Sequence, residues 1–218
     1  RCFIVAEVSA NHNKNFVVLK KFLKDLKKTG IDAVKLQAYQ ANTITINNKS
    51  KDFRIKKVNS WSKFEYLYKL YKQAETPIQW FPKIFSFCKK INLTVFASVF
   101  DESNLKVLEE LNCPAYKIAS PEITDIPLIR KIAKTKKPII LSNGLADLKD
   151  LSLAIKEISK INKKLVVLKC TSSYPTSIEE LNLMTMKDIQ KKFKCLSGFS
   201  DHTVGINTSI HAASLGAC

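Results

Sequence analysis

Two lysines lie inside short apolar segments of this chain, where a charged side chain is not expected. Lys35 falls within the apolar run 33–39 and Lys117 within the run 115–119. Burying a lysine costs free energy unless its ammonium group meets an anion. Hydroxyl groups close to two such lysines would add hydrogen-bond donors for a phosphate or a carboxylate. These residue types therefore predict a binding site for an anionic substrate.

Other polar residues occur at or just after the ends of the apolar runs. In chain order they are Glu7, the loop Asn11-His12-Asn13, Gln37, Ser98, Asp101, Ser120, Ser142, Asn143, Thr171, Ser172, Tyr174, Ser200, Asp201 and His202. Some of them also allow a structural interpretation. Glu7 would form an internal ion pair with Lys35, and Tyr174 would pack in the loop before Pro175. We favour a functional site because seven consecutive runs all end in polar residues.

His202 is the best candidate for a metal ligand, because a neutral imidazole suits a divalent cation. Its alternative role is to cap a helix. His12 is equally consistent with a hydrogen-bonding role, and His211, in the middle of a predicted helix, with a structural one. One histidine does not make a metal site, so we expect at least one further ligand to lie outside these 218 residues.

Short apolar runs alternate with amphipathic stretches along the whole chain, which predicts βα units and a parallel sheet. The runs are 3–8, 33–39, 94–99, 115–119, 138–142, 165–170 and 196–199. Helical patterns cover 16–28, 78–90, 103–111 and 147–161. The first helix is expected to bury Val17, Phe22, Leu23 and Leu26, and the last Leu148, Leu151, Ile155, Ile158 and Ile161.

Seven such units fit either an open doubly wound sheet or a barrel. A doubly wound sheet would need a glycine-rich phosphate loop after an early strand, and the sequence has none. A barrel collects its site from the C-terminal ends of many strands, which is the pattern seen here. We therefore predict an α/β fold of the TIM-type (β/α)8 class. Because the chain stops where an eighth strand would begin and opens on Arg1 without a methionine, we expect residues 1–218 to be a catalytic barrel domain incomplete at both ends.

One stretch departs from the simple repeat. Residues 40–76 separate the second strand from the helix at 78–90 and combine a polar segment with the aromatic-rich WSKFEYLYKLY. A long excursion at this end of a barrel often shapes the substrate pocket. A surface insertion that packs Trp61, Tyr68 and Tyr71 against the barrel wall is the alternative.

The composition argues against several other classes of protein. The net charge of +17 comes almost entirely from lysines spread along helix faces, and no nucleic-acid-binding module is present. The charge would instead help to draw in an anionic substrate. No apolar run approaches the ~18 residues of a membrane span. The six cysteines form no CxxC pair, so we expect reduced, structural thiols and a cytoplasmic protein.

Six ordered motifs resemble the sialic acid synthase family. They are AEVSANHNKN, DAVKLQAY, PAYKIASPEITDIPLI, KPIILSNGLA, CTSSYP and GFSDHTVG, and the similarity runs from about residue 3 to 217. Within the family, the stretch LYKQAETPIQWFPK and the EITD after Lys117 look most like the branch of pseudaminic acid synthases.

The resemblance implies a transferase that condenses phosphoenolpyruvate with 2,4-diacetamido-2,4,6-trideoxy-L-altrose to give pseudaminic acid and phosphate. It also implies a divalent metal, Mn²⁺ or alternatively Mg²⁺ or Co²⁺, that polarises the sugar aldehyde. Glu7, Lys117 and His202 would be catalytic, with His202 as the metal ligand and Glu7 beside the aldehyde and the attacking water. The residues implied to hold phosphoenolpyruvate are Lys35, Ser98, Lys117, Ser120, Ser142, Ser172 and Ser200, and Gln37 and Tyr174 would face the sugar.

Departures from the family pattern limit what the resemblance implies. The family's second metal-binding histidine and its C-terminal antifreeze-like domain, which completes the partner's site in a homodimer, would lie beyond Cys218. Asn143 replaces a usual threonine, and NHNK replaces the commoner NHNG. We therefore expect the 218-residue chain alone to have little or no activity. An N-acetylneuraminate or legionaminate synthase, or a basic binding protein that has lost catalysis, are the alternative functions.

Overall fold

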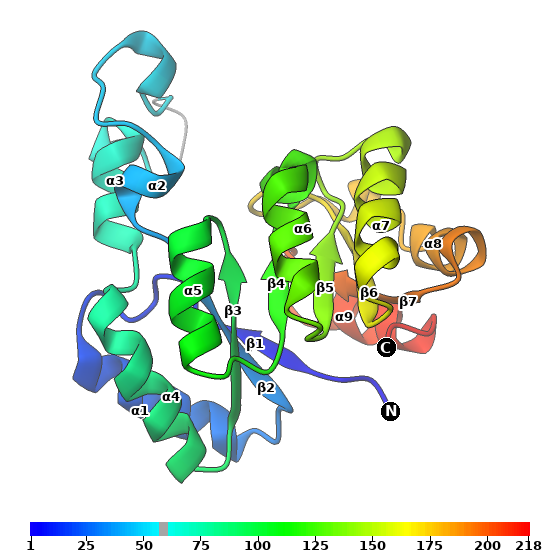
Figure 1. Cartoon of the computed structure of the whole chain (residues 1–218), viewed down its shortest axis with the longest axis horizontal. Helices are drawn as coiled ribbons and strands as arrows, with labels where there is room; N and C mark the ends of the chain where they lie inside the picture. Colours follow the sequence, from blue (N-terminus) through cyan, green and yellow to red (C-terminus); the bar gives the residue numbers. More distant parts are fainter. Residues whose placement is uncertain (57–60) are drawn as a thin grey trace. The chain divides into compact units, whose positions relative to one another are not determined.

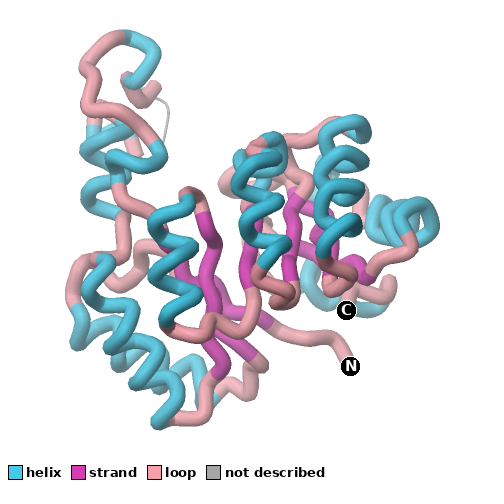
Figure 2. The backbone as a smooth tube through the Cα atoms, viewed as in Figure 1, coloured by secondary structure: helices cyan, strands magenta, loops and turns pink. Residues whose placement is uncertain are grey.

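The computed structural model describes residues 1–56 and 61–218, which divide into two compact units. The N-terminal unit comprises Ile4–Cys113, and the C-terminal unit comprises Pro114–Cys218 together with Arg1–Phe3. In both units short parallel strands alternate with helices along the chain, as Figures 1 and 2 show. The alternation of apolar runs and amphipathic stretches thus predicts the repeat correctly.

The N-terminal unit is built on three parallel strands. They are β1 (Val5–Glu7), β2 (Ala33–Ala38) and β3 (Thr94–Val99). β2 pairs with both of the others, so that Glu7 is in register with Lys35 and Gln37 with Ser98. The helices of this unit are α1 (Phe16–Lys28), α2 (Ala41–Ile44), α3 (Leu67–Ala74), α4 (Phe81–Lys90) and α5 (Glu102–Glu110), with 3-10 turns at Lys51–Phe53, Ser62–Phe64 and Ile78–Trp80.

The C-terminal unit continues the same repeat with four parallel strands. They are β4 (Tyr116–Ile118), β5 (Ile139–Ser142), β6 (Leu165–Cys170) and β7 (Leu196–Ser200), paired in that order. Its helices are α6 (Ile126–Lys134), α7 (Leu148–Ile161), α8 (Thr185–Phe193) and α9 (Asn207–Ser214), with 3-10 turns at Ser120–Thr124 and Ile178–Glu180. Asp125 and Asp147 cap α6 and α7, because their carboxylates accept hydrogen bonds from backbone N–H groups of the first turn.

The buried faces of the helices correct the sequence analysis in two places. Val17 was expected in the core but is 75% exposed, whereas Leu19 and Leu23 are fully buried. Val17 lies about 200° around the helix from Leu19 and therefore faces away from the sheet. Leu148, the first residue of α7, is also exposed, although Leu151, Ile155 and Ile158 of the same predicted face are buried.

The first apolar run is shorter as a strand than the sequence indicates. Phe3 and Ile4 are about half exposed and precede β1, so that only the end of the run is paired with β2. Conversely, β7 extends one residue past the predicted run, to Ser200. The predicted helix at 78–90 divides into a 3-10 turn and α4.

The excursion between β2 and α4 contains two helices that pack on one another, α2 and α3 (Figure 1). Residues 57–60 of the excursion lie outside the described residues. Tyr71 on α3 contacts the buried ring of Tyr39, which directly follows β2, edge to face with ring centroids 6.0 Å apart. Trp61 is 43% exposed and Tyr68 is partly buried. The excursion is therefore packed onto the end of β2 through α3.

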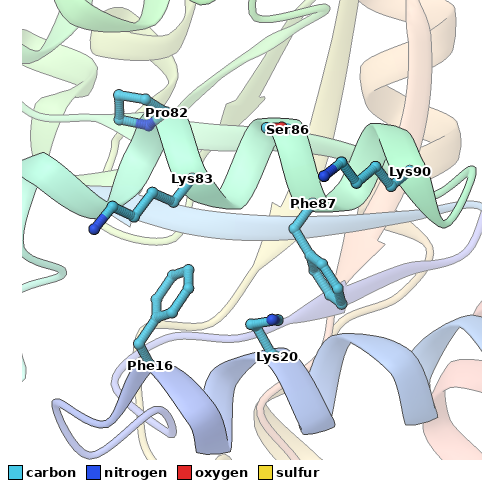
Figure 3. A pocket seen from close by; sticks show the side chains of 7 residues that line it. All are labelled: Phe16, Lys20, Pro82, Lys83, Ser86, Phe87 and Lys90. Carbon is cyan, nitrogen blue, oxygen red and sulfur yellow. The ribbon is translucent and has the colours of Figure 1, made fainter.

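A surface groove of about 410 Å³ separates α1 from α4 (Figure 3). Two phenylalanines and three lysines line most of it, and Pro82 and Ser86 complete the lining. The Lys20 ammonium lies 5.1 Å from the centroid of the Phe87 ring, a cation–π contact across the groove. None of the polar residues predicted for the site lines this groove. Among the described residues, no helix is both long enough and apolar enough to span a membrane.

Candidate functional site

In the N-terminal unit, three of the predicted site residues lie together at neighbouring strands. The Lys35 ammonium forms an ion pair with the Glu7 carboxylate and lies 3.4 Å from the Ser98 hydroxyl oxygen. Lys35 and Gln37 are two residues apart on β2 and therefore point to the same side of the sheet. The internal ion pair proposed as an alternative for Glu7 does form. It leaves the Glu7 side chain 38% exposed, so its carboxylate is also accessible from solvent.

His12, in the loop after β1, is fully buried and has a hydrogen-bonding role, one of the two that the sequence allowed. The backbone N–H of Lys14 donates to its Nδ1 atom at 3.0 Å, so Nε2 carries the proton and donates to the Thr76 hydroxyl at 3.2 Å. The Trp80 ring packs edge-on against the imidazole. Burial, followed by the nearby Lys14 charge, lowers the pKa of His12 and favours the neutral ring.

In the C-terminal unit, Lys117 is the most buried charged residue of the predicted set, at 4% exposure. Its ammonium donates to the Ile118 carbonyl oxygen at 3.0 Å. Burial lowers the pKa of Lys117 to about 8, and the charges of Cys170 and Glu122 only partly oppose this shift. With this one carbonyl acceptor among the described residues, the ammonium has donor capacity left for an anion. This geometry supports the prediction of an anion site at Lys117.

Gly144, in the loop after β5, lies against the side chains of Ser120, Cys170 and Ser172, which we call the anion cradle. A Cβ atom at this position would lie 2.5 Å from the Ser172 hydroxyl, 2.9 Å from the Ser120 hydroxyl and 3.1 Å from the Cys170 sulfur. The Gly144 N–H donates to the Ser120 hydroxyl oxygen at 2.9 Å. Because glycine has no Cβ atom, the hydroxyls of two serines predicted to bind substrate can lie this close to Gly144.

Ser142 and Ser200 complete the predicted hydroxyls of this unit. Ser142 ends β5, and its buried hydroxyl has no hydrogen-bond partner within the described part of the chain. Ser200 ends β7 and is in register with Cys170 at the end of β6. A buried hydroxyl without a partner costs free energy, so Ser142 is available to a bound ligand.

His202 is held in a defined orientation. Its Nδ1–H donates to the Thr171 carbonyl oxygen at 2.8 Å and also faces the Cys170 sulfur at 3.9 Å. The Tyr174 ring lies against the imidazole, with ring centroids 4.1 Å apart. The helix cap proposed as an alternative is not its role, because α9 begins only at Asn207.

These contacts leave the Nε2 lone pair of His202 available, which is the arrangement typical of a metal-bound histidine. His202 is thus suited to act as one ligand of a metal ion. Among the described residues, no group of three or more His, Cys, Asp or Glu side chains could hold a metal ion. The expectation that a further ligand lies outside these residues stays a prediction.

Cys170 and Glu122 belong to this site but were not singled out in the sequence. Burial raises the pKa of the Cys170 thiol, but His202, then Ser120 and Lys117, outweigh it and leave the pKa below its usual value. Burial raises the pKa of Glu122 to about 7, against the opposing Lys117 charge, and one carboxylate oxygen is buried without a hydrogen-bond partner in the described structure. Glu122 lies two residues after Ser120, a spacing that could have marked it. All six cysteines are free thiols, as predicted.

The chain belongs to the NeuB family, whose model matches residues 22–218. It is 45% identical to a pseudaminic acid synthase of Helicobacter pylori over 215 residues and 41% identical to a pseudaminic acid synthase of Campylobacter jejuni. It is 34% identical to an N,N'-diacetyllegionaminic acid synthase of Campylobacter jejuni. These matches cover 98–100% of the chain, which spans 63% of the length of the first two relatives and 66% of the third.

The fold is similar to that of a solved N-acetylneuraminic acid synthetase from Leptospira borgpetersenii in complex with citrate. The TM-score is 0.86 at 27% identity, and the match covers 99% of this chain and 70% of that one. The predicted TIM-type α/β barrel class and the predicted family are thereby confirmed.

Proposed function

We propose that the natural full-length protein carries out the condensation of phosphoenolpyruvate with 2,4-diacetamido-2,4,6-trideoxy-L-altrose, giving pseudaminic acid and phosphate. One observation carries the proposal. The Lys117 ammonium is buried, and the same unit contains the hydroxyls of Ser120 and Ser172 beside Gly144. Similarity to two pseudaminic acid synthases supports this choice of sugar.

In the proposed reaction, C3 of phosphoenolpyruvate forms a bond to the aldehyde carbon of the sugar, and water adds at C2. The phosphate then leaves as its bond to C2 breaks. Lys117, with Ser120, Ser142 and Ser172, would hold the phosphate and carboxylate of phosphoenolpyruvate through charge-assisted hydrogen bonds. Lys35, Ser98 and Ser200 would supply further donors.

The reaction also needs side chains that can accept or donate a proton near neutral pH. The Glu7 carboxylate, held by Lys35 and open to solvent, would orient and deprotonate the attacking water. Glu122, whose pKa is raised to about 7, would exchange a proton at neutral pH. Gln37 and Tyr174 would face the sugar.

A divalent metal would be bound through Nε2 of His202, with Mn²⁺ as the first choice and Mg²⁺ or Co²⁺ as alternatives. When bound, it would supply Lewis-acid polarisation of the aldehyde oxygen. The protein's own part is to fix the imidazole through Thr171 and Tyr174, so that Nε2 faces away from the backbone.

The test combines the natural full-length protein with phosphoenolpyruvate, Mn²⁺ and a panel of amino-sugar aldehydes, and measures phosphate release. We expect release that is fastest with the L-altrose derivative. The 34% identity to an N,N'-diacetyllegionaminic acid synthase makes the sugar aldehyde that gives that product the second candidate. Release with none of the sugars, together with salt-dependent DNA binding, would instead favour a basic binding protein.

We also propose that the natural protein acts in the cytoplasm as a homodimer. Six free thiols fit a reducing compartment. Light scattering of the natural full-length protein would measure its mass in solution and so check the dimer.

A further inference from the structure

Two adjacent residues, Glu75 and Thr76, join three segments of the N-terminal unit that are far apart in the sequence. Both are buried, at 6% and 1% exposure, and they follow α3 at the end of the excursion. The Glu75 carboxylate accepts the Ala41 N–H at 2.8 Å on one oxygen. Its other oxygen receives the ammonium groups of Lys14 at 3.5 Å and Lys72 at 2.8 Å.

Thr76 holds the loop after β1, which contains His12 and Lys14, through a second contact. Its hydroxyl accepts the Nε2–H of the fully buried His12 at 3.2 Å. Asn13 and Lys14 have φ angles of +47° and +52°, a left-handed conformation that non-glycine residues adopt only at a cost of about 1 kcal/mol or more each. The loop after β1 is therefore held in a strained form by contacts from residues 75 and 76.

The loop after β1 and the start of α2 each follow a strand that carries a predicted site residue. The loop containing His12 and Lys14 begins after β1, which ends in Glu7. Ala41 begins α2, four residues after Gln37 on β2. Burial raises the pKa of the Glu75 carboxyl, but Lys72, the Ala41 N–H and Lys14 outweigh it and leave the pKa below its usual value, so the carboxylate is charged at neutral pH.

We propose that Glu75 and Thr76 are positioning residues that hold the loop after β1 and the start of α2 in the form that receives the sugar aldehyde. This inference rests on the proposed function, because Glu7 and Gln37 are the residues assigned there to the aldehyde and the sugar. Glu75 and Thr76 do not touch the substrates. They act through the backbone that follows Glu7 and Gln37.

Glu75→Gln removes the negative charge that pairs with Lys14 and Lys72, and Thr76→Val removes the hydroxyl that contacts His12. Both variants keep the approximate shape of the side chain. We expect each to raise the KM for the sugar aldehyde about tenfold and to leave the KM for phosphoenolpyruvate within about twofold. Thr76→Ser retains the hydroxyl and should restore the KM of the natural protein. Lys72→Met is the matched control. Lys72 binds the same carboxylate oxygen as Lys14, but in the described structure this ion pair joins two residues of one segment.

Amide hydrogen exchange supplies a readout that does not depend on activity. Peptides covering residues 8–16 should exchange faster in Glu75→Gln and Thr76→Val than in the natural protein, and at an unchanged rate in Lys72→Met. If the natural protein is inactive with every sugar, the proposed function fails. Hydrogen exchange would still test whether Glu75 and Thr76 hold the loop after β1. An active protein whose two variants change neither exchange nor the sugar KM would overturn the inference. Equal rises in both KM values, with a lowered Tm, would also overturn it.

Discussion

The Nδ1 atom of His202 lies 2.8 Å from the carbonyl oxygen of Thr171, so in the neutral ring this nitrogen carries the proton and Nε2 presents a lone pair. Asparagine can reproduce the Nδ1–H donor but has no equivalent of Nε2. We therefore expect His202→Asn to keep the Tm of the natural protein and to weaken Mn²⁺ binding by about tenfold or more, measured by electron paramagnetic resonance of free Mn²⁺. Unchanged Mn²⁺ affinity would show that His202 is not a ligand.

Lys117 should stabilise ligand binding and destabilise the fold. Replacing it by methionine removes a buried charge and retains the length of the side chain. We expect Lys117→Met to lose phosphoenolpyruvate binding in calorimetry and to raise the free energy of unfolding at pH 7 by up to about 3 kcal/mol. A variant that bound phosphoenolpyruvate normally would remove Lys117 from the site.

The same residue gives a pH dependence of stability with a defined sign. Because burial lowers the pKa of Lys117 from 10.5 to about 8, the unfolded chain binds more protons than the folded one between these values. The stability advantage of Lys117→Met over the natural protein should thus be largest below pH 8 and should shrink as the pH rises toward 10.5. Urea unfolding of both proteins at matched pH values measures this difference. A constant difference across that range would contradict a buried ammonium.

Gly144→Ala should block the anion cradle and leave the backbone unstrained. Its φ angle is not among the positive values, so alanine is compatible with the local conformation. The added methyl group would lie within 3 Å of the hydroxyls of Ser120 and Ser172. We expect the KM for phosphoenolpyruvate to rise roughly tenfold or more in the phosphate-release assay, with a change in Tm of only a few degrees. Normal kinetics would mean that the hydroxyls move aside without consequence.

The repeat of strands and helices was predictable because each element carries its own apolar periodicity. Errors arose at element ends, where periodicity gives no information about what covers a residue. Val17 lies on the far side of α1 from Leu19, and Leu148 stands at the first position of α7. Both are apolar, but neither meets the core.

The site residues that could be predicted are those that stand at the end of a strand, since the fold itself brings such residues together. Ser120 was found in this way, whereas Lys35 and Lys117 were found because each interrupts an apolar strand. The roles of Glu75, Thr76 and Gly144 could not be found, because they depend on contacts between segments that are distant in the sequence. Cys170 was interpreted as a structural thiol, whereas its sulfur faces His202.

The close approach of two serine hydroxyls to Gly144 also offers a way to sort the natural diversity of such chains. An alanine at this position would be compatible with the fold, so a gene carrying it would still encode a folded protein. The same methyl group would occupy the place where two serine hydroxyls meet. A change of this glycine codon to alanine would thus keep the architecture and remove the anion site.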